Sequence, residues 1–308
     1  MTPVIETRAL SKRYGSHAAL HDLDLVVDPG TVFGLVGPNG AGKTTTLRLL
    51  LDIIRPSAGT VRVLGSDPRT GGAALRRRIG FVPGELRLDG RTSGRALLAH
   101  LAEISGPVAP GTIEALAERL GLDLGRPVRT LSKGNKQKIG LVQAFMHRPP
   151  LLVLDEPTSG LDPLVQREFL TMVREARDAG QTVLLSSHVL SEIQQSADEV
   201  VVLAQGRIVA RGSVESLRSA SVRRLRAVIV DASADTLRAA LEGVPAATDV
   251  AVTTSPSAGA VHVAATVRGE VDAVVRALMA GRLLDLTVEE PDLEESILDL
   301  YSRSETDR

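Results

Sequence analysis

A glycine-rich segment, GPNGAGKTT, constrains the fold of this 308-residue chain more than any other stretch. It spans residues 37–45 and matches the pattern G-x-x-x-x-G-K-[ST] in full. The apolar run VFGLV precedes it and an apolar helical stretch follows, which is the strand–loop–helix context that a phosphate-binding loop requires. A glycine-rich surface turn would need neither flank. The segment therefore predicts an α/β protein that binds a nucleotide.

The chemistry of this loop follows from its residue types. The glycines let the backbone curl so that successive N–H groups point inward, and the helix N-terminus adds partial positive charge. Lys43 can reach the β- and γ-phosphates, and the Thr44 hydroxyl can ligate Mg²⁺. We expect the nucleotide-binding residues to be Gly37, Pro38, Asn39, Gly40, Ala41, Gly42, Lys43, Thr44 and Thr45.

Short apolar strands alternate with helical stretches along residues 1–217, which predicts a mainly parallel sheet. From about residue 85 to 148 the pattern is helical, and this block is expected to be an insertion into the α/β domain. Residues 222–302 follow the order βαββαβ, typical of a small ferredoxin-like α+β domain. The tail at 303–308 is expected to be disordered.

Two carboxylates end the apolar run LLVLDEP. Asp155 lies where a nucleotide-bound Mg²⁺ needs a direct or water-mediated ligand. Glu156, one residue further, can accept a proton from the water that attacks the γ-phosphate. Two carboxylates at a strand end could instead form a solvated turn or a helix cap. The complete phosphate-binding loop upstream favours the catalytic interpretation.

His188 follows another apolar run, TVLLSS. We expect it at the carboxyl edge of the parallel sheet, where ligands of open α/β folds bind. There it would contact the γ-phosphate and position both the attacking water and Glu156. The other five histidines, His17 among them, are interpreted as surface or packing residues.

With these segments in order, the chain resembles the nucleotide-binding subunits of ATP-binding cassette transporters. The resemblance rests on GPNGAGKTT, LSKGN, LLVLDEP, SGLD and SSH, and it covers residues 1 to about 217. It implies ATP as the nucleotide, ATP hydrolysis, and head-to-tail pairing of two copies or of two related subunits. Each ATP would then be held between the phosphate loop of one subunit and the LSKGN segment of the other.

The LSKGN segment, residues 131–135, corresponds to the family's Leu-Ser-Gly-Gly-Gln signature. The resemblance implies that Ser132 and Gly134 contact phosphate at a helix N-terminus. Lys133 and Asn135 replace a glycine and the glutamine, and they are assigned to the same site. Lys133 adds positive charge at this helix end, as do the lysines at 136 and 138, which could equally solvate a helix face.

Three further site residues follow from the resemblance. Tyr14 in SKRYGS corresponds to the aromatic residue that stacks on adenine, and Asp162 in SGLD lies in the loop that crosses the dimer interface. Asp162 could also cap the helix that begins at Pro163. Glu85 stands where the family usually has a glutamine that senses the γ-phosphate, and it is expected to bind Mg²⁺ or its waters.

Composition bears on the partners of such a subunit. The formal net charge is −1, so nucleic acid is not an expected partner. No run reaches the roughly 20 apolar residues that span a bilayer, so a role at a membrane requires separate polytopic permease subunits. The resemblance, with the C-terminal extension, is to bacterial drug- and antibiotic-export subunits. It implies a peripheral protein at the cytoplasmic face of the cell membrane.

A soluble ATP-driven switch that acts on ribosomes or nucleic acid is the alternative within the same superfamily. Such switches typically carry two cassettes or a long coiled-coil insertion, whereas this chain has one cassette and no heptad array. A phosphate-loop kinase would leave the LSKGN and SGLD segments without a purpose. The C-terminal domain carries no chemical motif and is interpreted as a packing or dimerisation module, with a regulatory domain as the alternative.

Overall fold

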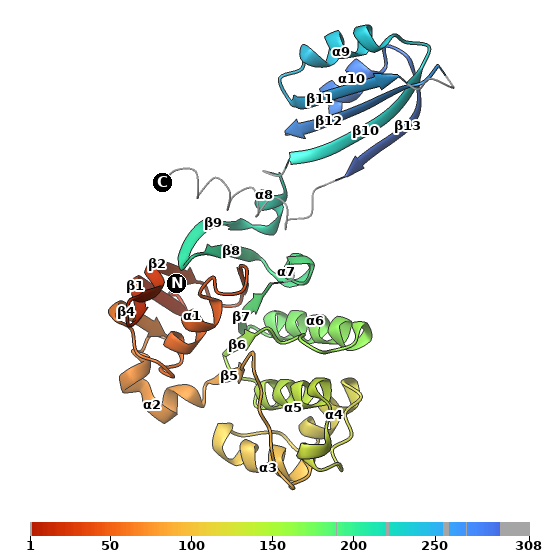
Figure 1. Ribbon diagram of the computed structural model, residues 1–308. Coiled ribbons are helices and arrows are strands. Elements are labelled where there is room, and N and C mark those ends of the chain that lie inside the picture. The colour runs from red at the N-terminus through yellow and green to blue at the C-terminus, as the bar shows by residue number, and fades with distance from the viewer. Residues whose placement is uncertain (1, 189, 220–221, 255–258, 269, 290–308) are drawn as a thin grey trace. The chain divides into compact units, whose positions relative to one another are not determined.

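The computed structural model describes residues 2–188, 190–219, 222–254, 259–268 and 270–289, and its chain forms two compact units, residues 1–213 and 214–308 (Figure 1). Each unit has a hydrophobic core of its own. The predicted tail at 303–308 and the part of the predicted C-terminal domain beyond residue 289 lie outside the described residues.

A six-stranded sheet forms the centre of the N-terminal unit. Its strand order is β5-β6-β7-β3-β8-β9, and all neighbours are parallel except β8 and β9. Every residue of β3, β6 and β7 is buried, which explains why these strands are continuous apolar runs. The strands are β3 (Val32–Val36), β5 (Ile79–Val82), β6 (Leu151–Asp155), β7 (Thr182–Ser187), β8 (Glu199–Ala204) and β9 (Arg207–Ser213).

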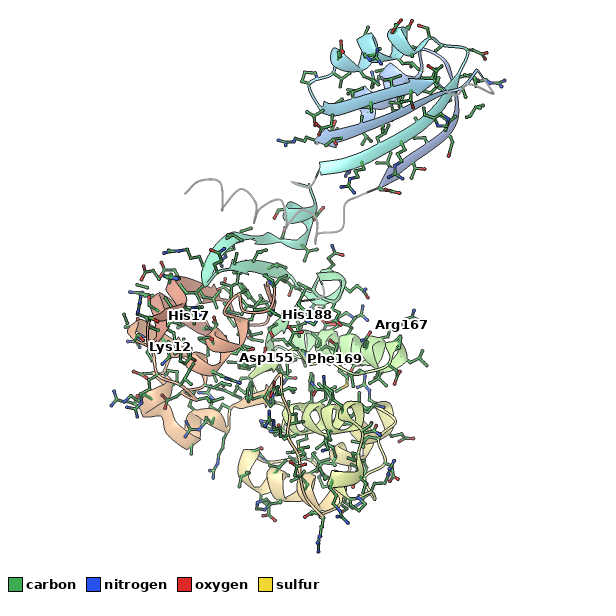
Figure 2. The ribbon with its side chains drawn as sticks, viewed as in Figure 1. Lys12, His17, Asp155, Arg167, Phe169 and His188 are labelled. Atoms are coloured by element: carbon green, nitrogen blue, oxygen red, sulfur yellow. The ribbon has the colours of Figure 1, made fainter. Side chains whose placement is uncertain are left out.

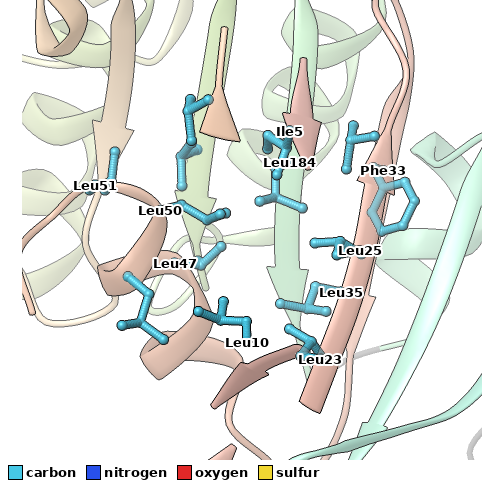
Figure 3. Packing of buried hydrophobic residues seen from close by; sticks show 14 of the residues in the cluster. Ile5, Leu10, Leu23, Leu25, Phe33, Leu35, Leu47, Leu50, Leu51 and Leu184 are labelled. Atoms are coloured by element: carbon cyan, nitrogen blue, oxygen red, sulfur yellow. The ribbon is translucent and has the colours of Figure 1, made fainter. Parts of the chain in front are cut away.

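A second sheet is antiparallel, with the order β2-β1-β4. It contains β1 (Ile5–Tyr14), β2 (His17–Val27) and β4 (Ala58–Val63). The side chains of Leu10, Leu25 and Leu35 from the two sheets meet Leu47 of helix α1 (Lys43–Leu50) in one buried cluster (Figure 3). This packing therefore holds α1 against both sheets. The turn side of the β1–β2 hairpin, residues 11–19, is largely exposed and shows no apolar alternation.

The helical block predicted at 85–148 contains three of the helices of this unit, α3, α4 and α5 (Figure 1). Arg119 of α4 donates hydrogen bonds to Glu168 and Glu175 of α6, at 2.6 and 2.7 Å, and so ties the block to α6. The bond from Arg119 lowers the pKa of the Glu175 carboxyl. Among the helices of the described residues, none combines the length and apolar character that crossing a membrane requires. Besides α1, the helices are α2 (Pro68–Arg76), α3 (Gly94–Ser105), α4 (Thr112–Arg119), α5 (Lys133–Phe145), α6 (Pro163–Asp178) and α7 (Leu190–Ser196).

The C-terminal unit confirms the predicted ferredoxin-like architecture. Its antiparallel sheet has the order β11-β12-β10-β13. Alternate residues of β12 are buried and share a core with Leu237 of α9 and Val274 of α10. The elements are α8 (Val214–Ser219), β10 (Val222–Val230), α9 (Ala234–Glu242), β11 (Ala247–Thr254), β12 (Val261–Arg268), α10 (Asp272–Leu278) and β13 (Arg282–Glu289).

Candidate functional site

The segment between β3 and α1 forms a tight loop whose backbone depends on glycine. Gly40 and Gly42 have φ angles of 83° and 109°, in the left-handed region that residues with a Cβ rarely adopt. A Cβ on Gly37 would lie 2.4 Å from the carbonyl oxygen of Leu203 in β8. The loop therefore fits against its neighbouring strand because position 37 carries no side chain.

Helix α1 begins inside this loop, and its first residue is Lys43. The preceding residue, Gly42, provides no side-chain cap, so the first N–H groups of the helix are left for a bound anion. Lys43 is 6% exposed, and its Nζ donates hydrogen bonds to the carbonyl oxygens of Gly37 at 2.5 Å and Pro38 at 3.3 Å. The loop thus wraps around a buried ammonium group.

Two carboxylates lie at the end of β6, beside the loop. Asp155 is 2% exposed, and its Oδ1 accepts a hydrogen bond of 2.6 Å from the Ser186 hydroxyl. A Cβ on Gly84 would lie 3.1 Å from its Oδ2. The N–H group of Glu156 donates to the carbonyl oxygen of Ser186 at 3.1 Å, although φ of Glu156 is 49°, an unfavourable angle for a residue with a Cβ. Strand β7 thus holds Glu156 in a strained conformation.

The Glu156 carboxylate lies between a cation and an imidazole. Its Oε1 is 3.4 Å from Nζ of Lys43, and its Oε2 is 2.5 Å from Nδ1 of His188. His188 directly follows β7, the strand that pairs with β6, so both side chains come from the same edge of the sheet. Figure 2 labels His188 and Asp155, the residue before Glu156. The predicted base and its predicted helper are therefore in direct contact.

A cavity of about 410 Å³ opens over these groups. It is lined by Tyr14, His17, Ala19, Pro38, Asn39, Gly40, Ala41, Gly42, Lys43, Thr44, Thr45, Gly84, Glu156, Ser159 and His188. Sequence reasoning did not assign His17, Ala19, Gly84 and Ser159 to this site. The signal that could have found His17 is its pairing with Tyr14 across the turn of the β1–β2 hairpin.

Tyr14 brings an aromatic ring to the cavity from the end of β1. It is 47% exposed, and Nζ of Lys12 lies 5.0 Å from the ring centroid. Figure 2 shows Lys12 and His17 on this same hairpin. An exposed ring at the side of a polar cavity can stack on a planar base.

The LSKGN segment contains the N-cap and the first three residues of α5. Ser132 is the N-cap, and its hydroxyl accepts a hydrogen bond from the N–H group of Asn135 at 3.3 Å. Lys133 is the first helical residue, so the replacement of a glycine does not strain the backbone. A Cβ on Gly134 would lie 2.4 Å from the carbonyl oxygen of Gly160, so glycine at 134 is required by close packing.

None of residues 131–135 lines the described cavity of the same chain. Instead, Nζ of Lys133 donates a hydrogen bond of 3.0 Å to the hydroxyl of Ser159, which does line it. Asp162 is the N-cap of α6, where its Oδ1 accepts from the N–H groups of Leu164 and Val165, both at 3.1 Å. The structure thus shows the capping role of Asp162.

Glu85 is not brought together with the other predicted site residues. Its side chain is exposed and pairs with Arg87 at 3.1 Å, whereas its neighbour Gly84 lines the cavity. Thr44 and Asp155 are the remaining predicted ligands of a cation. A hydroxyl and a carboxylate fit Mg²⁺, which usually takes one or two protein ligands and keeps water and phosphate oxygens as the others.

Comparisons with known proteins show which proteins this chain is similar to. A family model described as ABC transporter matches residues 20–159. The daunorubicin/doxorubicin resistance ATP-binding protein DrrA of Streptomyces peucetius is 38% identical over 233 residues, which cover 73% of this chain and 71% of DrrA. The bacitracin transport ATP-binding protein BcrA of Bacillus licheniformis is 36% identical over 211 residues, or 68% of this chain and 69% of BcrA. The solved structure of an ATP-binding subunit of an ABC transporter superposes with a TM-score of 0.65 and 32% identity over 70% of this chain and 92% of that one.

Proposed function

Since the chain belongs to the ABC transporter family, whose ATP-binding domain hydrolyses ATP, we propose that it is the ATPase subunit of an exporter. In this proposal, closure of two such subunits on ATP drives separate membrane-spanning subunits. One observation carries the proposal. Lys43, Glu156 and His188 converge on a single cavity behind a glycine-dependent loop, which is the arrangement that ATP hydrolysis needs.

The loop and Lys43 form the phosphate-binding part of the proposal. The free N–H groups at the start of α1 attract the phosphates, and Nζ of Lys43 exchanges its carbonyl partners for phosphate oxygens. Thr44 and Asp155 are the residues that would hold Mg²⁺. When bound, that ion would neutralise charge on the phosphates.

Glu156 is proposed as the general base. It lies at the cavity wall, and His188 contacts the same carboxylate. His188 therefore orients the carboxylate toward the water that attacks the γ-phosphate, and Glu156 takes the proton of that water. Positioning and charge stabilisation account for most of the rate in such reactions.

A second subunit is proposed to complete the site. The N-terminus of α5 offers N–H groups, and Lys133 adds positive charge, but its residues do not line the cavity of their own chain. Two copies arranged head to tail would place Ser132 and Gly134 of each on the nucleotide of the other. The C-terminal unit is proposed to be an accessory module, because all residues that line the cavity lie between 14 and 188.

A groove of about 440 Å³ is the proposed docking surface for the membrane-spanning partner. Ile53 and Ile104 are about half exposed and line the same groove, and a shared apolar surface of this kind marks an interaction site. Strand β5 leads from the groove toward Gly84, which lies next to Asp155. A movement at the nucleotide site would therefore be transmitted through β5 to a helix docked in the groove. The groove is lined by Leu51, Ile53, Ala73, Arg76, Arg77, Ile79, Phe81, Ile104, Ser105 and Gln143.

The double variant Ile53→Asp/Ile104→Asp tests this docking. Burying one isoleucine side chain against a partner contributes about 1.5–3 kcal/mol to the free energy of association, and an aspartate loses this contribution. The association should therefore weaken at least about tenfold. The measurement is co-purification with the polytopic membrane protein encoded by the neighbouring reading frame, together with a nucleotide titration that should not change. Leu164→Asp is the matched control, because Leu164 is exposed on α6 and does not line the groove. Unchanged association of the double variant would refute the groove, and co-purification with ribosomes or nucleic acid would favour a soluble switch.

Tyr14 provides a test of base recognition. Stacking of a base on an aromatic ring is worth about 1–3 kcal/mol, so Tyr14→Ala should weaken ATP binding about fivefold to a hundredfold. Tyr14→Phe keeps the ring and should bind within about threefold of the parent. Titration with a fluorescent ATP analogue measures both variants, and equal affinity of Tyr14→Ala and Tyr14→Phe would exclude stacking.

A further inference from the structure

A buried carboxylate outside the cavity joins two segments that end at the proposed site. Glu192 of α7 is 9% exposed, and its Oε2 accepts hydrogen bonds from the hydroxyls of Thr158 at 2.8 Å and Ser187 at 3.0 Å. A buried carboxylate is tolerated where donors of this kind satisfy it. The two hydroxyls therefore define where this side chain lies.

The two hydroxyls belong to the segments that follow neighbouring strands. Ser187 immediately precedes His188, and Thr158 lies two residues after Glu156. At the sheet edge these segments are still joined by the bond from the N–H group of Glu156 to the carbonyl oxygen of Ser186. The carboxylate of Glu192 connects the same two segments a second time, through Ser187 and Thr158.

Helix α5 holds the same segment from another direction. Nε2 of Gln137, which is 3% exposed, donates a hydrogen bond of 3.0 Å to the carbonyl oxygen of Pro157. Residues 157–158 are thus fixed by α5 on one side and by Glu192 of α7 on the other. Ser159, which lines the cavity, and Asp162 follow in the same loop.

We propose that Glu192 is a positioning residue for ATP hydrolysis. It holds the segments after β6 and β7 at a fixed separation. His188 therefore contacts Glu156, and the loop at 158–162 keeps its conformation. Without this carboxylate, His188 and Glu156 lose their alignment while the phosphate loop stays intact. The inference rests on the roles proposed above for Glu156 and His188.

Glu192→Leu and Thr158→Val each remove one partner of the hydrogen bond at nearly constant volume. We expect each to lower kcat for ATP roughly tenfold to a hundredfold, since small misplacements of catalytic groups reduce rates to this degree. KM for ATP and binding of a non-hydrolysable ATP analogue should change less than about threefold, because neither residue lines the cavity.

Conservative variants separate positioning from general destabilisation. Glu192→Gln keeps an acceptor oxygen and Thr158→Ser keeps a hydroxyl, so both should retain kcat within about threefold of the parent. The double variant Glu192→Leu/Thr158→Val should be little worse than Glu192→Leu alone, because Glu192→Leu already removes the hydrogen bond from Thr158.

Three results would overturn the inference: unchanged kcat in both Glu192→Leu and Thr158→Val, losses of kcat that multiply in the double variant, or loss in Thr158→Ser equal to that in Thr158→Val. Glu156→Gln is measured in the same series. If Glu156→Gln still turns over ATP, the proposed general base is wrong. If Glu156→Gln is inactive while Glu192→Leu and Thr158→Val are fully active, the inference about Glu192 alone is wrong.

Discussion

Glu156→Gln is expected to bind ATP with near-normal affinity and to lose at least about a hundredfold in turnover. A positioned general base contributes typically 10²–10⁴-fold to a rate, and an amide cannot take the proton from water. The change is nearly isosteric, and it also replaces a carboxylate that lies 3.4 Å from Nζ of Lys43. Removing that negative charge from the cavity should favour a polyanion rather than disfavour it. Phosphate release during single and multiple turnovers measures the loss.

The same variant should accumulate an ATP-bound dimer, because bound nucleotide is no longer consumed. Size-exclusion chromatography with ATP and Mg²⁺ measures the dimer. Glu118→Gln is the matched control, since this glutamate is exposed on α4, far along the chain from the cavity-lining residues. Turnover by Glu156→Gln at the rate of Glu118→Gln would show that another group activates the water.

Lys43→Ala should weaken ATP binding about a hundredfold or more. A hydrogen bond to a charged group contributes about 1.5–3 kcal/mol, and Lys43 offers several donors to the phosphates from a site that is 6% exposed. Its loss would also leave the carboxylate of Glu156 facing the phosphates without the neighbouring cation. Both effects weaken the binding of ATP.

Isothermal titration with ATP measures the effect of Lys43→Ala, and thermal unfolding verifies that the variant is folded. Arg8→Ala serves as the control, because Arg8 is an exposed cation on β1 that pairs with Glu6. Equal affinities of Lys43→Ala and Arg8→Ala for ATP would mean that the loop does not bind the phosphates.

Local sequence signals predicted the parts of the fold that depend on local chemistry. The apolar runs at β3, β6 and β7 predicted strands of a mainly parallel sheet, and the βαββαβ order predicted the fold class of the C-terminal unit. The tight phosphate loop could be predicted from the glycines at 40 and 42, because its positive φ angles require glycine at these positions. The order of strands in the large sheet was not readable, because it depends on crossovers between distant segments.

Long-range contacts determine what the sequence did not reveal. Glu192 looks like any acidic residue on a short helix, and its burial depends on Thr158, 34 residues earlier in the chain. Glu85 occupies the sequence position of a family glutamine, yet it pairs with Arg87 at the surface, while Gly84 reaches the cavity. Lys133 departs from the family pattern, and its helical backbone and its bond to Ser159 explain why lysine is accommodated there.

The most direct test of the account is the structure of Glu156→Gln crystallised with ATP and Mg²⁺. Two copies should enclose each nucleotide, with its phosphates in the loop at 37–45 of one copy and the N-terminus of α5 of the other copy against the γ-phosphate. In particular, the Ser132 hydroxyl and the Gly134 N–H group should lie within hydrogen-bonding distance of phosphate oxygens. A closed, nucleotide-bound dimer in which these two residues point away from every phosphate would contradict the account.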